Sequence, residues 1–155
     1  MANWEAFASA APEIAALGRE RLYQSGPGLA YLGTVRADGA PRIHPVCANI
    51  VDGGLYLMIL PSPKRADLVR DGRFALHAFP MEGGDDEFYL TGTVSRREDA
   101  ALVERVARHQ RASGATTGGA EWLFELDLER ALYARYTPAE AGGGFPPDYL
   151  QWSEG

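Results

Sequence analysis

LAYLGTV (29–35), PRIHPVCANI (41–50) and LYLMIL (55–60) are three strand-like runs that decide the fold, because only short connections separate them. These connections contain Asp38-Gly39 and Asp52-Gly53-Gly54. Asp-Gly between apolar runs indicates a hairpin, since the turn needs a positive φ that glycine adopts without strain. The three runs therefore predict an antiparallel meander.

Further strands and helices follow from the same patterns. Strands are predicted over 74–79, 88–95, 122–128 and 131–136, with a bulge at Gly92 and a connection at 127–130. Helices are predicted over about 10–24, 62–72 and 98–112. The C-terminal tail, about 138–155, is predicted to be irregular, and its aromatic residues indicate that it packs on the body or on a second subunit. Six or seven strands with helices outside them predict a mainly β (α+β) antiparallel barrel.

Length and composition limit the classes of function. The 155 residues predict a single domain over 1–155, with 46% hydrophobic residues and a net charge of -6. The negative charge argues against nucleic acid and anionic membranes as partners, although it leaves room for a local basic pocket. The single Cys47 excludes an internal disulfide, and no cluster of ligands predicts a metal site. Without a leader-like or membrane-spanning pattern, we expect a cytoplasmic protein.

The segment PSPKRADLVRDG (61–72) has the features of a helix start that binds an anion. Pro63 suits the first helical position, which makes Ser62 the N-cap. Helix N-termini attract anions because their backbone N–H groups are free and the helix dipole is positive there. Lys64 and Arg65 add full charges in that turn, so the segment predicts a phosphate site. The alternative is a solvated surface helix.

Arg42 and His44 lie on one face of the second predicted strand, because side chains alternate along a strand. A guanidinium presents a planar fork that suits a phosphate, and Lys64 offers a compact charge. The two cations are thus expected to clamp one phosphate from different directions. The alternative for Arg42 is an ion pair with a carboxylate such as Asp52 or Asp67, and the alternative for His44 is simple packing.

The RIHPV segment (42–46), followed after one more strand by SPKRADLVRDGRFALH (62–77), resembles the pyridoxamine 5'-phosphate oxidase-like, FMN-binding split-barrel family. The resemblance extends roughly from residue 29 to residue 136. It implies a split β-barrel, usually a homodimer, that holds FMN or a deazaflavin in a cleft at the dimer interface. It also implies two sets of cofactor-binding residues: Arg42, Lys64, Ser62 and Arg65 at the flavin phosphate, and His44, Pro45 and Val46 beside the ring.

The chain lacks a convincing match to the C-terminal signature with which the founding oxidase of that family grips pyridoxal. We therefore expect an FMN-binding oxidoreductase that passes hydride between the flavin and a small organic substrate or a nicotinamide, and not a vitamin B6 oxidase. One alternative is a deazaflavin-dependent reductase on the same fold. Another is a non-catalytic flavin or haem carrier or sensor. The sequence assigns no catalytic residue and leaves turnover open.

Other polar or aromatic residues favour structural roles. His77 and His109 have no Cys, His or acidic partner at ligand spacing. Cys47 lies within a strand without a nearby His, which predicts a buried thiol. Aromatic residues at strand spacing are candidates for a flavin slot, with core packing as the alternative: Tyr31, Trp122 and Trp152.

Overall fold

The computed structural model describes residues 1–138 and 141–155. Within them the chain forms helices and strands in this order: α1 (Trp4–Ala10), α2 (Pro12–Leu22), β1 (Leu29–Val35), β2 (Pro41–Val51), β3 (Gly54–Ile59), α3 (Pro63–Arg70), β4 (Arg73–Ala78), β5 (Glu87–Arg97), α4 (Ala100–Ala112), β6 (Trp122–Arg135) and β7 (Asp148–Ser153). No helix in these residues is both long and apolar enough to cross a bilayer.

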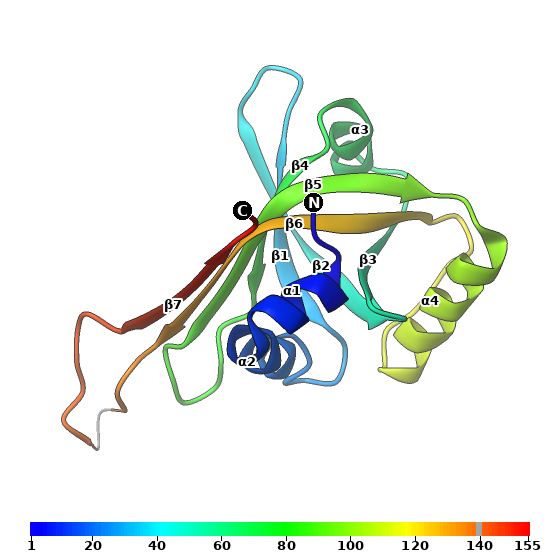
Figure 1. Ribbon diagram of the computed structural model, residues 1–155. Helices are drawn as coiled ribbons and strands as arrows, with labels where there is room; N and C mark the ends of the chain where they lie inside the picture. The colour runs from blue at the N-terminus through cyan, green and yellow to red at the C-terminus, as the bar shows by residue number, and fades with distance from the viewer. Residues whose placement is uncertain (139–140) are drawn as a thin grey trace.

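Six antiparallel strands close into a barrel. The sheet order is β3-β2-β1-β4-β5-β6-β7, and β3 also pairs with β6, which closes the ring. The first part of β6 pairs with β3 and belongs to the barrel. Its last part, Arg130–Arg135, pairs with β7. Figure 1 shows that β6 and β7 extend away from the barrel as an arm. The prediction of a six- to seven-stranded antiparallel split barrel with flanking helices is confirmed.

The barrel interior is filled by alternate residues of the strands. Ala30 and Leu32 of β1 and Leu76 of β4 are at most 1% exposed, as period-two burial requires. Helices α1 and α2 cover this core from outside, and α4 lies apart from them beside β3 (Figure 1). Phe7 of α1 is fully buried and lies 5.0 Å, centroid to centroid, from the ring of Trp152 in β7.

Strand β6 is continuous, so the prediction of two strands joined at 127–130 is wrong. The polar pair Glu129-Arg130 is exposed but remains within the strand. Thr91 of β5 pairs with Arg130 and Gly92 pairs with Leu128, so Glu129 is an extra residue opposite this step. The bulge predicted at Gly92 is therefore present, with its extra residue on β6. This bulge stands where the sequence predicted a turn between two strands.

Two predictions at the chain ends also need correction. The predicted helix over 10–24 is shorter, Pro12–Leu22, and a separate helix, α1, precedes it. The tail is not irregular throughout, because Asp148–Ser153 forms β7 on the edge of β6. The packing of Trp152 on Phe7 confirms that the tail contacts the body. Residues 139–140 of the predicted tail lie outside the described residues.

Candidate functional site

Helix α3 begins as its sequence predicts. Ser62 is the N-cap and Pro63 is the first helical residue. The Ser62 hydroxyl accepts a hydrogen bond from the Arg65 amide at 3.4 Å and donates one to the Leu60 carbonyl at 2.8 Å. The first turn contains Lys64 and Arg65 and no acidic residue. This end of the helix therefore combines the positive end of its dipole with two full positive charges.

Asp67 is a buried carboxylate beside this turn, with a side chain that is 3% exposed. It accepts hydrogen bonds from Thr34 Oγ1 at 2.8 Å, from Arg42 Nε at 2.7 Å and from Arg70 at 3.2 Å. Burial raises the pKa of Asp67, but the hydrogen bonds from Arg42, Thr34 and Arg70 outweigh it and hold the pKa below its ordinary value. Asp67 is therefore ionised at neutral pH and ties β1 and β2 to α3.

Arg42 thus makes the ion pair with Asp67 that the sequence offered as its alternative role. Its side chain is 27% exposed, and the bond to Asp67 uses Nε alone. Among the described residues no acceptor is recorded for the two terminal nitrogens of Arg42. The carboxylate consequently fixes the guanidinium without using its fork, which is the part that recognises phosphate.

The predicted cations lie on both sides of α3. A hollow of about 330 Å³ on one side is lined by Arg36, Arg42 and Arg70 together with Asp67. A second hollow, about 360 Å³, is lined by Ser62, Arg65 and Trp122 among others. Ala66 lines both hollows. The structure therefore brings Arg42 to the helix but separates it from Ser62 and Arg65 by the width of α3.

Lys64 and the residues after Arg42 occupy intermediate positions. Lys64 lies three residues before Asp67, which places the two on one face of α3, and no ion pair of Lys64 is recorded among the described residues. His44 is half-buried on the same face of β2 as Arg42, while Pro45 is exposed and Val46 is 8% exposed. Arg42, His44 and Val46 therefore share the inward face of β2, from its cationic end to the core, and Pro45 lies on the outward face, opposite Tyr31.

Trp122, at the start of β6, contacts two guanidinium groups. The Arg65 carbon Cζ lies 4.2 Å from the ring centroid and that of Arg96 lies 3.5 Å from it. Arg65 also donates to the Ala120 carbonyl at 3.1 Å. Trp122 is half-buried, so it is neither a fully buried core residue nor a free aromatic wall. No local sequence pattern predicts this cluster, because its members come from α3, β5 and β6.

The remaining candidates of the sequence take local roles. His77 Nδ1 lies 2.6 Å from the Ala78 carbonyl, and its other ring nitrogen lies 3.6 Å from a Glu87 carboxylate oxygen. Cys47 is half-buried, not fully buried as predicted, and burial raises the pKa of its thiol. The described residues contain no group of three or more His, Cys, Asp or Glu residues that would hold a metal ion.

Comparison with solved structures identifies the fold. No protein-family model and no curated protein sequence matches the chain. The heme binding protein from Mycobacterium smegmatis is similar over 87% of this chain, with a TM-score of 0.63 and 17% identity. This chain covers 57% of that protein's length.

Two further structures give the same result. HutZ, the heme storage protein from Vibrio cholerae, aligns over 76% of this chain and 89% of its own, with a TM-score of 0.58 and 19% identity. A NimC/NimA family protein from Clostridium acetobutylicum aligns over 89% of this chain and 93% of its own, with a TM-score of 0.62 and 16% identity. At these identities the similarity shows the architecture alone, which is that of a split β-barrel.

Proposed function

We propose that the protein is an FMN-binding oxidoreductase that passes hydride between the flavin and a small organic substrate or a nicotinamide. One observation carries the proposal: Asp67 holds Arg42 against α3, on the helix face that Lys64 shares with Asp67, and the first turn of α3 contains no acidic residue. A phosphate monoester is a small dianion, and it needs cations, free N–H groups and access from solvent. This end of the barrel supplies the cations and the access from solvent, and the positive end of the α3 dipole adds to them.

The residues present fit the phosphate of a flavin. The free terminal nitrogens of Arg42 would bind two phosphate oxygens, and Lys64 would add a point charge from the helix. His44 and Val46, on the face of β2 that carries Arg42, would contact the ring and keep water from one of its faces. The flavin itself would supply the redox chemistry, and the chain would contribute binding, orientation and an apolar surface.

The proposal includes a homodimer with the site at its interface. Hollows of about 330 and 360 Å³ lie at the lower end of cofactor-pocket volumes, so a flavin ring needs another wall. The outer face of β1, β2 and β5 exposes large apolar side chains: Tyr31 at 37%, Ile43 at 69% and Tyr89 at 36%. A second copy placed on this face would cover them. A flavin-bound monomer, measured by light scattering, would contradict the proposed homodimer.

The clamp is tested by calorimetric titration of FMN into the unaltered protein and five variants. Arg42→Ala and Lys64→Ala are each expected to weaken binding by about 1–3 kcal/mol, the range for a charged hydrogen bond. Arg42→Lys keeps a charge near Asp67 but loses the fork, so it should also weaken binding. Arg108→Ala is the matched control, because Arg108 lies on α4 with a side chain that is 73% exposed. Unchanged affinity for FMN in a folded Arg42→Ala, Lys64→Ala double variant would show that these two residues do not bind the phosphate.

Haem is a second candidate cofactor, and the carrier or sensor role goes with it. The half-buried imidazole of His44 has no hydrogen bond recorded among the described residues and lies on the same strand face as Arg42. If haem were bound, His44 would supply a nitrogen for the iron and Arg42 a charge for a propionate. Titration with haem decides the matter: a Soret shift that His44→Ala abolishes would favour haem over flavin.

A deazaflavin remains the alternative flavin, since its anionic tail needs the same cations. Titration with a deazaflavin alongside FMN separates the two. Binding of the deazaflavin alone would replace FMN in the proposal. Bound flavin that neither NAD(P)H nor a common acceptor cycles would favour the non-catalytic role.

A further inference from the structure

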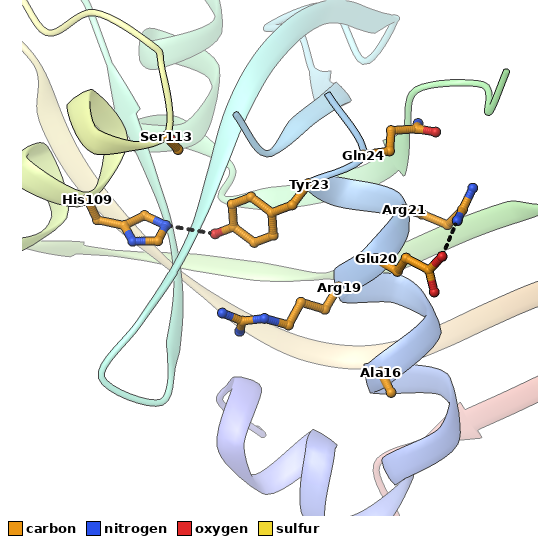
Figure 2. A pocket seen from close by; sticks show the side chains of 8 residues that line it. All are labelled: Ala16, Arg19, Glu20, Arg21, Tyr23, Gln24, His109 and Ser113. Atoms are coloured by element: carbon orange, nitrogen blue, oxygen red, sulfur yellow. Dashed lines mark hydrogen bonds and ion pairs between the residues drawn. The ribbon is translucent and has the colours of Figure 1, made fainter. Parts of the chain in front are cut away.

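A separate cleft is lined by residues of α2, α4 and the segments that follow them, and both helices lie away from α3 in Figure 1. Its volume is about 710 Å³, which is within the usual range for small-molecule sites. Side chains of α2 and of the residues just after it form one wall, and His109 of α4 with Ser113 forms the other (Figure 2). None of the residues expected to hold a flavin lines this cleft.

A short hydrogen-bonded chain crosses the cleft floor. The Ile50 amide donates to the Tyr23 hydroxyl at 2.8 Å, and this hydroxyl lies 3.0 Å from His109 Nε2 (Figure 2). Because the hydroxyl already accepts from Ile50, its own proton is available for Nε2. When the Tyr23 hydroxyl donates this proton to Nε2, neutral His109 carries its own ring proton on Nδ1. His109 therefore keeps one N–H donor that Tyr23 does not use.

Arg19 supplies a positive charge on the same side. Its guanidinium carbon lies 5.5 Å from the centroid of the Tyr23 ring, and Figure 2 shows it extending from α2 toward the side where His109 lies. Among the described residues no ion pair of Arg19 is recorded, whereas Arg21 of the same helix is paired with Glu20 at 2.9 Å. Arg19 thus gives the cleft a charge without a recorded counter-ion.

We propose that this cleft binds a small aromatic carboxylate. The carboxylate would lie between the Arg19 guanidinium and the Nδ1–H of His109, and the ring would lie against Tyr23. The charge selects an anion, since Glu20 is neutralised by Arg21. The flat surfaces of Tyr23, His109 and Arg19 favour a planar body over a branched one. This site is independent of the flavin proposal, and either can fail without the other.

Binding has a protonation consequence. Burial, and then the charge of Arg19, lower the pKa of His109, so its imidazole is neutral at neutral pH. A bound carboxylate offsets the charge of Arg19 and favours imidazolium, which raises that pKa. On its own helix Arg105 precedes His109 by one turn but is bound to Asp52 at 2.6 Å. Affinity should therefore fall as pH rises through the His109 pKa of the complex.

The experiment is an NMR titration of the full chain with benzoate, following the imidazole signals. The chain has three histidines, so His109→Gln assigns the signal. Benzyl alcohol, which has a similar shape without the charge, is the ligand control. Arg19→Gln removes the proposed anion partner, and Arg108→Gln is the matched control on exposed α4 surface.

We expect saturable benzoate binding that raises the His109 pKa, with Arg19→Gln weakening it about tenfold or more. Arg108→Gln should leave affinity unchanged, and benzyl alcohol should bind at least about tenfold more weakly than benzoate. In Arg19→Gln, benzoate should no longer raise the His109 pKa. That loss would support a binding role for Arg19, because a merely structural role would not change this response. The proposal is overturned if benzoate fails to saturate the His109 shift, or if Arg19→Gln binds it as the unaltered protein does.

Discussion

Replacing Asp67 with Asn tests the buried cluster that positions Arg42. The substitution keeps the size of the side chain but removes its charge. Asp67 is 3% exposed and has three side-chain donors around it, two of them guanidinium groups. Loss of one partner from a buried ion pair costs about 3–5 kcal/mol. Because Arg42 and Arg70 are 27% and 41% exposed, water replaces part of that interaction, and we expect about 2–4 kcal/mol.

The pH dependence of this effect has a definite sign. The folded-state pKa of Asp67 is below its ordinary value, so its ionised form stabilises the protein above the unfolded pKa, near pH 4. That contribution is lost as pH falls through the folded pKa. The difference in unfolding free energy between the two proteins should therefore be fully present at pH 7 and shrink below about pH 4.

Urea denaturation followed by tryptophan fluorescence measures both effects, because the chain has three tryptophans. Glu98→Gln is the control, since Glu98 is 73% exposed in its pair with Arg96 and exposed pairs are worth about 0–1 kcal/mol. A loss under about 1 kcal/mol for Asp67→Asn at pH 7, or a difference that persists unchanged in acid, would refute the reasoning.

Three further substitutions test the fold by the same denaturation assay. Gly92→Ala would place Cβ in steric conflict with the Asp127 carbonyl oxygen, so we expect a loss of about 1–3 kcal/mol in unfolding free energy. An unchanged denaturation midpoint would contradict the close approach. Tyr133→Phe removes a 2.9 Å hydrogen bond to Asp86 and should cost about 1–3 kcal/mol. Burial and Asp86 raise the pKa of Tyr133 to about 12, so the stability difference between the two proteins should shrink as pH rises from about 10 toward that value. A difference that persists unchanged over this range would disprove it. Asp99→Ala removes the α4 cap, which accepts from two amides, and should cost about 0.5–2 kcal/mol; far-UV circular dichroism should show a less stable helix.

Local signals explain which elements the sequence predicts well. The strand over 29–35 and the helix that starts after Ser62 have the predicted positions because turn glycines, a cap and a proline act within a few residues. Helix α1 was not predicted, although Asn3 caps it and Trp4 and Phe7 have helical spacing. Its seven residues are too few to form a stable helix alone. The helix is stabilised by the burial of Trp4 and Phe7 against the barrel.

Long-range contacts explain what the sequence leaves open. Whether 127–130 is a turn or a bulge depends on the pairing of β6 with β5, and no local residue determines that pairing. The role of Arg42 depends on which carboxylate α3 brings to it. Both Asp52 and Asp67 were candidates, and the fold selects Asp67 while Asp52 binds Arg105 of α4. The cleft at His109 is of the same kind, because Tyr23 and His109 are 86 residues apart.

The central proposal is that the cationic end of the barrel holds a flavin by its phosphate. Parallel calorimetric titrations with FMN and with riboflavin, which lacks the phosphate, test it most directly. We predict that FMN binds and that riboflavin binds at least about tenfold more weakly, since the phosphate provides charged hydrogen bonds. Equal affinities for the two flavins, or no binding of FMN, would contradict the proposal.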